Sequence, residues 1–356
     1  MGPLSALAEV LTVRWFAVAI VLPLGLALPV SAAAQPAAPV VQCTVSDERV
    51  AELSGLAADA DHWYAVNDGG TDSSVYVLTK DCAVESVITG DTDPYDVEDL
   101  ARAADGTFWL ADAGDNDSDR ETVALISLTA DGDSAVHRLT YPDGAHDSEA
   151  VFLDGAGTPY LVTKNPLGVA EVYRPAGPLA SPGPTPLEHV ASVQITPTDT
   201  QGGPVPEIVG SVTVTGGASM ADGSVIALRT YTDAYLYAVP DGDVVAALAT
   251  EPVRVPLPDE AQGEAIAFDP DGSLVSASEL VGQPIRVVTG AADLLTPEPP
   301  ADAPAGGGGD QAAAGGGDRS GDDDGLPALP AAAVTIAFVG GILLFMRWRA
   351  ARRAGR

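Results

Sequence analysis

Short apolar runs separated by turn residues recur from about residue 50 to residue 290. Five of these runs begin with a polar or small residue, at residues 53–57, 97–101, 148–152, 215–219 and 263–267. Most are followed by a turn that contains Asp-Gly, by a second apolar run, and by a segment that alternates apolar and polar positions. Short runs bounded by turns, without a helical period, predict consecutive antiparallel β-strands.

The spacing of these runs indicates a repeat. Ser54, Glu98 and Glu149 follow one another at intervals of 44 and 51 residues, and Gly216 and Glu264 are 48 residues apart. A repeat of roughly 45 to 50 residues with three or four strands is typical of a β-propeller blade. The 67 residues from Glu149 to Gly216 include a proline- and glycine-rich passage, which is either an insertion or the remains of a further blade. The pattern predicts an all-β propeller of five or six blades, with a β-sandwich as the alternative.

Both ends of the chain carry targeting signals. Residues 328–346 are uncharged, and five arginines follow within residues 347–356. At about 1.5 Å per residue such a run covers the hydrocarbon core of a bilayer, so we predict a transmembrane helix at 328–346 and a basic cytoplasmic tail at 347–356. Residues 1–34 hold Arg14, an apolar run and small residues up to Ala34. They predict a cleaved signal peptide, and an uncleaved second helix is the alternative.

These signals set the expected organisation of the chain. We expect the β-propeller ectodomain at residues 40–290. Residues 291–327 are rich in glycine, proline and aspartate and have almost nothing to bury, so we expect a disordered acidic stalk there. The protein is then a single-pass protein of the cell membrane with an extracytoplasmic N-terminal domain. Covalent attachment to the wall is the alternative, but residues 326–330 lack the Thr-Gly pair that sorting enzymes cleave.

Charge and cysteine content narrow the functional classes. The formal net charge is −33, which repels phosphate backbones, so no nucleic-acid partner is expected. Such a surface attracts divalent cations, with calcium favoured by carboxylate and carbonyl ligands, and general solubility is the alternative interpretation. Cys43 and Cys82 both fall in the expected ectodomain. An even count in an oxidising compartment predicts one disulfide, between an N-terminal strand and the first blade.

Equivalent repeat positions converge in a propeller because the first strand of each blade lines the central channel. Glu98, Glu149 and Glu264 occupy one such position. Three carboxylates in a partly desolvated channel repel by on the order of several kcal/mol unless a cation joins them. The sequence therefore predicts a Ca²⁺ site at these glutamates, with Asp68 and Asp112, at the ends of second strands, as further ligands. The alternative is that the glutamates accept hydrogen bonds from strand amides and stay separated by water.

Three further residues are catalytic candidates. Lys164 and Arg229 stand at the ends of second strands, where a cation pair holds an anionic substrate group beside a metal or neutralises the carboxylates through buried salt bridges. His146 directly precedes the run at 148–152 and is either an acid or base near neutral pH or a turn residue that caps the strand. The sequence contains no nucleophile elbow, zinc-protease helix, P-loop or dinucleotide fingerprint, so these classes are set aside.

Several short motifs together carry a family resemblance. They are LSGL at 53–56, NDG at 67–69, VEDL at 97–100, AGDN at 113–116, HDSEA at 146–150, LRTY at 228–231 and QGEAI at 262–266. As a set they resemble secreted prokaryotic propellers of the phytase-like, esterase-like group, which are related in pattern to NHL-type and lactonase propellers. The resemblance implies a propeller fold and a calcium-assisted hydrolytic or ligand-binding site. The chain departs from it at Gly216, where the fourth repeat lacks the acidic residue.

Two functions follow as expectations. The first is a membrane-anchored propeller that binds a small ligand or a cell-envelope component, with calcium as the expected cofactor and a protein partner left open. The alternative is a metal-dependent hydrolase that acts on a phosphoester or a lactone. In it, metal held by the glutamates activates water while Lys164 and Arg229 hold the anion. The sequence names neither the ligand nor the substrate.

Overall fold

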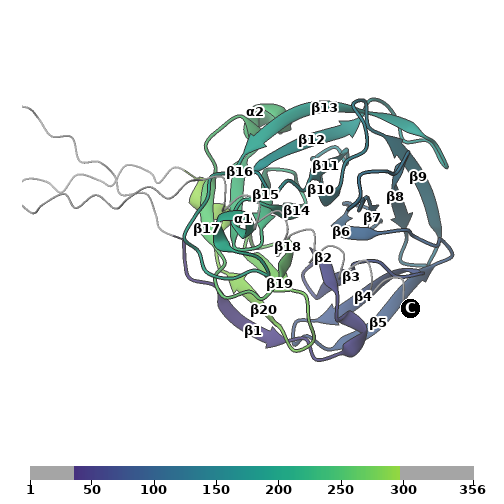
Figure 1. The fold of residues 1–356 in the computed structure, drawn as a ribbon. Coiled ribbons are helices and arrows are strands. Elements are labelled where there is room, and N and C mark those ends of the chain that lie inside the picture. Colours follow the sequence, from purple (N-terminus) through teal and green to yellow (C-terminus); the bar gives the residue numbers. More distant parts are fainter. Residues whose placement is uncertain (1–35, 297–356) are drawn as a thin grey trace, which may run out of the picture. The chain divides into compact units, whose positions relative to one another are not determined.

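The computed structural model describes residues 36–296, and this part of the chain is nearly all β, as the sequence predicted (Figure 1). The strands fall into sets of four that are consecutive and antiparallel, and a short turn joins the first strand of most sets to the second. In these turns Gly106 and Gly272 have φ values of 92° and 81°, which side-chain-bearing residues adopt only with strain. The Asp-Gly pairs in the sequence mark these turns.

The first set forms a sheet of its own. Its strands, in order from the inner to the outer one, are β2 (Leu53–Ala58), β3 (His62–Asn67), β4 (Ser73–Thr79) and β5 (Val84–Gly90). The inner strands β2 and β3 are buried along nearly their whole length, whereas β5 is mostly exposed or half-buried. This gradient from the inner to the outer strand recurs in the other sets.

The second and third sets join into one eight-stranded sheet. Their strands are β6 (Val97–Arg102), β7 (Phe108–Asp112), β8 (Val123–Leu128), β9 (Ser134–Thr140), β10 (Ser148–Leu153), β11 (Pro159–Thr163), β12 (Val169–Pro175) and β13 (Thr185–Gln194). The joint is a short parallel pairing in which Thr185 and Pro186 of β13 lie opposite Leu139 and Thr140 of β9. The ten residues of β13 and the long connection after it account for the 67-residue interval in the repeat.

The remaining strands form two more four-stranded sheets. One contains β14 (Val214–Ser219), β15 (Val225–Thr230), β16 (Asp233–Ala238) and β17 (Val253–Pro256); the other contains β18 (Gly263–Phe268), β19 (Leu274–Ser278), β20 (Pro284–Val288) and β1 (Val40–Thr44). Short helices lie in the connections: η1 (Glu48–Val50), α1 (Glu207–Gly210), η2 (Pro240–Gly242), α2 (Val244–Leu248) and η3 (Ala292–Leu295). The N-terminal strand β1 therefore completes the sheet built from the last strands of the domain.

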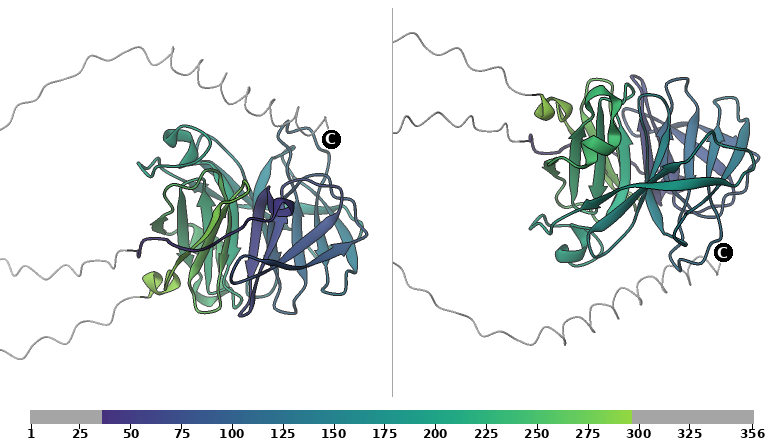
Figure 2. Two further views of the ribbon diagram at one scale, coloured as in Figure 1. Left: turned by 90° about the horizontal axis from the view of Figure 1, so that it is seen from below. Right: turned by 90° about the horizontal axis from the view of Figure 1, so that it is seen from above.

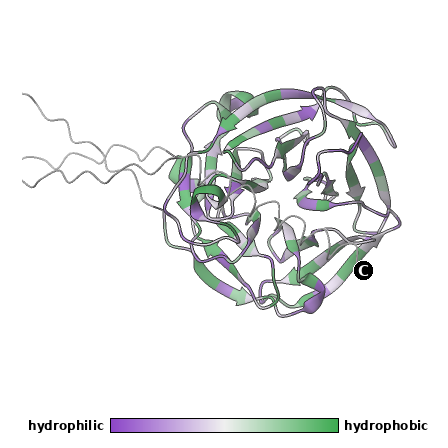
Figure 3. Cartoon of the chain, in the orientation of Figure 1, coloured by the Kyte–Doolittle hydropathy of each residue, from purple (hydrophilic) through white to green (hydrophobic). Residues whose placement is uncertain are grey.

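The sheets are arranged around a common axis (Figures 1 and 2). The inner strands contact one another in a closed order, β2 with β6, β6 with β10, β10 with β14, β14 with β18, and β18 with β2. Apolar side chains fill the space between adjacent sheets, among them the fully buried Trp63 and Phe152. Hydrophobic residues are distributed along the strands of every sheet (Figure 3). Residues 36–296 thus form a β-propeller.

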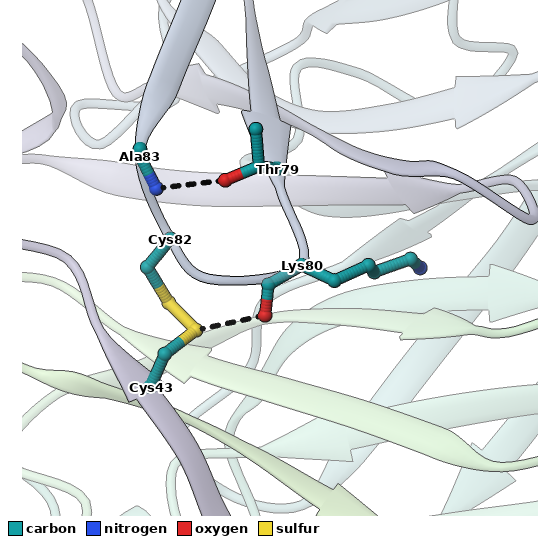
Figure 4. The surroundings of a disulfide bond; sticks show 5 residues. All are labelled: Cys43, Thr79, Lys80, Cys82 and Ala83. Atoms are coloured by element: carbon teal, nitrogen blue, oxygen red, sulfur yellow. Dashed lines mark hydrogen bonds between the residues drawn. A yellow bond between two sulfur atoms is a disulfide. The ribbon is translucent and has the colours of Figure 1, made fainter.

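The disulfide between Cys43 and Cys82 is confirmed (Figure 4). Cys43 lies in β1, at the outer edge of the last sheet, and Cys82 lies in the turn between β4 and β5 of the first sheet. Their Cα atoms are 5.8 Å apart. The bridge therefore joins the last sheet to the first and covalently reinforces closure of the ring.

Several predicted segments lie outside the described residues. These are the signal peptide at 1–34, the transmembrane helix at 328–346, the tail at 347–356 and most of the stalk at 291–327. Within residues 36–296, no helix is both long and apolar enough to cross a membrane. The first residues assigned to the stalk belong to the fold, because Ala291 is buried and Leu294 and Leu295 of η3 pack against the apolar core.

Candidate functional site

One face of the propeller collects the candidate residues. Strand direction alternates within each set, so the connection from the second to the third strand and the connection from the outer strand to the next inner strand leave the same ends of the strands. We call this end of the propeller the site face. The inner strands begin at this face.

A β-bulge lies near the start of every inner strand, where the pairing register shifts across one residue. The bulged residues are Ser54, Glu98, Glu149, Thr215 and Glu264, and all of them are buried. A bulge re-aims the side chain of the extra residue, so these five occupy equivalent places around the axis. The sequence comparison aligned Gly216 with the glutamates, but the register gives that place to Thr215. A Cβ atom on Gly216 would collide with the carbonyl oxygen of Glu264.

The two hydroxyl members of this ring connect neighbouring sheets. Ser54 Oγ donates to the carbonyl oxygen of Glu98 at 2.5 Å, and Thr215 Oγ1 donates to the carbonyl oxygen of Gly263 at 2.9 Å. Each bond reaches from one inner strand to the next. Serine and threonine thus satisfy buried carbonyl groups, whereas the three glutamates bring buried carboxylates that need other partners.

Asp68, Asp96 and Glu98 bring their carboxylate oxygens within 4.8 Å of one another, and all three residues are buried. We call them the carboxylate triad. Glu98 is 1 % exposed, and neither of its carboxylate oxygens has a hydrogen-bond partner among the described residues. Gly114 lies directly against the triad, because a Cβ atom there would collide with the carboxylates of Glu98 and Asp96. The absence of a side chain at Gly114 leaves the space into which these oxygens point.

Burial and repulsion between the carboxylates of the triad favour either protonation of Glu98 or binding of a cation. Burial raises the pKa of Glu98 well above its usual range, and the charges of Asp68, Glu149 and Asp96 raise it further. Lys164 lowers this pKa, but by less. A divalent cation between the carboxylates would reverse the balance, because it stabilises their ionised forms.

Lys164 lies beside Glu149, whose inner strand β10 is adjacent to that of Glu98. Its Nζ atom is 2.5 Å from Glu149 Oε1, and the lysine side chain is 15 % exposed. Burial raises the pKa of Glu149 to about 8 despite this ion pair, with contributions from Asp147 and Glu264. Burial alone would lower the pKa of Lys164, but Glu149 and the other nearby carboxylates hold it well above its usual range. Lys164 therefore carries its charge and neutralises part of the ring.

Asp112 does not join the triad but positions it. Asp112 Oδ1 accepts hydrogen bonds from the backbone N–H of Asp96 at 2.9 Å and from Arg120 Nη2 at 3.1 Å. Arg120 also donates to the carbonyl oxygen of Gly114 at 2.7 Å. The Arg120 guanidinium thus links the start and the end of the connection between β7 and β8, which contains Gly114 beside the triad. Asp112, expected from the sequence to be a metal ligand, instead anchors the backbone of Asp96.

Arg229 is fully buried, and its donors are used within the fold. It pairs with Glu260 at 2.8 Å and donates to the carbonyl oxygens of Thr230, Tyr231, Ala265 and Ala277. Space for the guanidinium exists because Gly263 has no side chain; a Cβ atom there would collide with it. The sequence suggested that Arg229 either holds an anionic substrate group or forms a buried salt bridge. The geometry matches a buried salt bridge, but to Glu260 and not to the glutamates of the ring.

His146 lies in an aromatic group near the third set. Its Nε2 atom is 3.0 Å from Asp143 Oδ1 and 3.0 Å from the hydroxyl of Tyr173, and its ring contacts those of Tyr141 and Tyr173. The hydrogen bonds of His146 thus go to Asp143 and Tyr173 and not to Glu98. This arrangement matches the turn residue, the second of the two roles expected from the sequence.

Asp99 and Asp96 are two buried acids near the centre that sequence reasoning missed. The Asp99 carboxylate accepts hydrogen bonds from the backbone N–H groups of Leu100 at 2.8 Å, Val151 at 2.8 Å and Gly217 at 3.0 Å. It therefore connects β6 to β10 and β14. Burial raises the pKa of Asp99 well above its usual range, although these donors lower it. The consecutive acids in the motif VEDL were the available signal, because a bulge lets neighbouring side chains both turn inward.

The chemistry of the triad fits a hard divalent cation. Calcium binds oxygen ligands at about 2.4 Å, so two ligands of one ion are at most about 4.8 Å apart, and the carboxylate oxygens of the triad lie within this limit of one another. The triad contains no cysteine or histidine, the ligands that structural zinc sites use. Asp68, Asp96 and Glu98 are therefore the residues that could hold a metal ion, and Lys164 stands on the adjacent part of the ring.

Comparisons with known proteins found no matching family, and the structural neighbours that they found are of low similarity. No protein-family model matches the chain, and no curated protein matches it. Among solved structures, glutaminyl cyclase from Myxococcus xanthus is 13 % identical with a TM-score of 0.41, and the match covers 71 % of this chain and 97 % of that one. The β-propeller domain of Cps50 (Swd1) from Myceliophteria thermophila is 12 % identical with a TM-score of 0.38, covering 70 % and 99 %. A candidate gluconolactonase is 12 % identical with a TM-score of 0.36, covering 64 % and 71 %.

Proposed function

We propose that this chain is a five-bladed β-propeller whose centre binds calcium and whose site face binds a ligand outside the cell. Each set of four strands is one blade, with β1 as the outer strand of the fifth. A signal peptide exports the domain, and the helix at 328–346 retains it at the membrane. The ligand is a small molecule or a component of the cell envelope.

The state of Glu98 carries the cation proposal. Its carboxylate is 1 % exposed and has no hydrogen-bond partner in the described part of the chain, yet it lies among other carboxylates. A buried charge costs several kcal/mol unless it is paired. A bound cation supplies that pairing, and the lack of a side chain at Gly114 lets the carboxylates of Glu98 and Asp96 lie close together.

Binding is favoured over hydrolysis because the catalytic candidates do not assemble. Arg229 is saturated inside the fold, and His146 lies in the aromatic group. Lys164 is the one observation that supports the hydrolase alternative, since its ammonium group affects the Glu98 carboxylate. In that alternative, a phosphoester or lactone binds to the cation with its anionic oxygen toward Lys164.

Calorimetric titration of calcium into the chelator-treated, full-length protein tests the proposal. We expect one bound ion per chain. Glu98→Gln should weaken calcium binding at least about a hundredfold, because it removes a charged ligand from the triad. Gly114→Ala should weaken it as well, because the methyl group displaces the Glu98 and Asp96 carboxylates. Glu121→Gln, an exposed carboxylate in the same connection, is the matched control and should bind as the unaltered chain does.

Two results would decide against parts of this proposal. Absence of calcium heat in a protein with a normal circular dichroism spectrum would remove the cation centre. Calcium-dependent turnover of a phosphomonoester, phytate or a lactone that Glu98→Gln abolishes would establish the hydrolase in place of a binding protein.

A further inference from the structure

Exposed apolar side chains are concentrated on the site face. Eight large apolar side chains are exposed among residues 36–296, and five of them lie in connections on this face: Tyr95, Leu167, Ile208, Leu280 and Val281. We call these five the apolar rim. Leu167 is 83 % exposed and Tyr95 is 71 % exposed. The other three lie on the outer strands β1 and β5, away from the connections.

The rim adjoins the centre and extends around it. Tyr95 directly precedes Asp96 of the triad, and Leu167 follows Lys164 by three residues in the connection from β11 to β12. Ile208 lies on α1, the short helix ahead of β14, which is drawn beside β15, β16 and β17 in Figure 1. The rim residues thus come from four different connections. An occupant that touches all of them extends beyond a single small molecule.

The backbone at Leu280 is held in a conformation that leucine rarely adopts. Its φ is 83°, in the left-handed region, and its side chain is 52 % exposed. The N–H of Leu280 donates to the carbonyl oxygen of Ala51 at 2.7 Å, which fixes this geometry. An exposed side chain gains nothing for the fold from this strain. Strained residues of this kind are concentrated at binding sites.

The negative charge of the same connections indicates which kind of binding partner fits this face. Exposed carboxylates accompany the apolar rim on the site face: Glu48, Glu52, Asp72, Asp91, Asp93, Asp117, Asp119, Glu121, Asp143, Asp199, Glu207 and Asp259. The exposed arginine of this face, Arg49, is paired with Asp47 at 2.6 Å. This surface attracts cationic groups and repels the headgroups of anionic lipids.

We propose that the site face binds a partner protein through a basic polypeptide segment that also carries apolar side chains. The basic groups of the segment lie against the exposed carboxylates, and its apolar side chains pack on the rim. Several connections contribute, which matches an extended chain better than a compact ligand. The segment need not contact the cation, so this binding does not depend on calcium.

Anisotropy titrations of the full-length protein test this proposal, with labelled peptides as probes. One peptide alternates lysine and leucine, and a second of equal length and charge alternates lysine and serine. At about 0.15 M salt, where unspecific attraction is screened, the lysine–leucine peptide should bind at least about tenfold more tightly. Combining Leu167→Ser with Leu280→Gly should remove this advantage. Val87→Ser, at an exposed site on β5, should retain it.

The outcomes separate this proposal from the others. Equal affinity for the two peptides, or unchanged affinity of the double variant, would overturn it. Rim-dependent binding to phosphatidylglycerol vesicles in place of peptide would overturn it in favour of a membrane surface. Melting temperature and calcium titration of the double variant show that it is folded and that its centre is intact. A failure of the cation proposal appears in the calcium titration, whereas a failure of the rim appears only with the peptides.

Discussion

In the absence of the proposed cation, the domain should become less stable as the pH rises from about 5 to 7.5. Burial is the largest cause that raises the pKa of Glu149 to about 8, and burial also raises that of Glu98. A carboxyl group with a raised pKa in the folded state binds its proton more tightly when folded. Its contribution to the unfolding free energy is fully present below the unfolded pKa, and it is lost as the pH rises through the folded pKa.

The size of the effect follows from the shift. Each pH unit between the unfolded and folded pKa values is worth about 1.4 kcal/mol for one group. From pH 5 to pH 7.5, Glu149 alone should therefore lower the unfolding free energy by on the order of 3 kcal/mol. Glu98 acts in the same direction. Calcium should suppress this loss, because the ion binds the ionised carboxylates of the folded state.

Urea unfolding at pH 5.5 and 7.5, with chelator and with calcium, measures the effect through far-ultraviolet circular dichroism. In chelator the midpoint should fall with pH, and in calcium it should stay level or rise. Glu149→Gln should flatten the profile in chelator, whereas Glu121→Gln should leave it unchanged. Identical profiles with and without calcium, or a midpoint in chelator that rises with pH, would refute the reasoning.

Three further predictions concern stability, each measured by urea unfolding. Asp99→Ala should lower the unfolding free energy by about 2 to 6 kcal/mol, because two buried N–H groups on neighbouring inner strands lose their acceptor, and Asp99→Asn should cost less; equal effects would contradict this. Leu280→Gly should raise stability by up to about 1 kcal/mol by relieving its left-handed backbone, and a loss would count against strain there. Reduction of the Cys43–Cys82 disulfide should cost about 4 kcal/mol, and an unchanged midpoint would exclude that contribution.

The repeat in the sequence was sufficient to predict the inner strands. The five runs that begin at residues 53, 97, 148, 215 and 263 coincide closely with β2, β6, β10, β14 and β18. The pattern is readable because both faces of an inner strand are buried, so its residues are mostly apolar or small apart from the acids near its start. The pairing of β1 with β20 was less accessible, since it joins segments more than 240 residues apart.

The site was predicted only where it follows the repeat. Glu98, Glu149 and Glu264 recur at one position, so alignment of the repeats finds them, and Asp68 was found at the end of its strand. Asp96 lies two residues before Glu98, as Asp147 lies two residues before Glu149, but its place in the triad depends on the loop that Asp112 and Arg120 hold in place. Tertiary contacts of this kind leave no periodic signal.

Arg229 shows how the strand register separates residues that spacing in the sequence places together. Thr230 and Thr163 are equivalent in the pairing of the inner two strands, so Arg229 corresponds to Val162 and not to Lys164, although both cations were expected to face the centre. Gly263 on the adjacent inner strand leaves room for the guanidinium, which turns into the wall between two sheets and pairs with Glu260. The direction of a long side chain is decided by the space its neighbours leave, which spacing in the sequence does not report.

Two adjacent residues of β6, Glu98 and Asp99, differ in role: Glu98 belongs to the proposed cation site, and Asp99 supports the structure of the ring. In a regular strand, Glu98 and Asp99 would point to opposite faces, and only one could reach the axis. The bulge at Glu98 buries both. The Glu98 carboxylate is then directed into the triad and has no hydrogen-bond partner among the described residues. The Asp99 carboxylate instead accepts hydrogen bonds from backbone N–H groups of β10 and β14. The hydrogen bonds that hold three inner strands together thus begin one residue from Glu98, the proposed cation ligand. Closure of the ring therefore helps to fix the position of Glu98 in the triad.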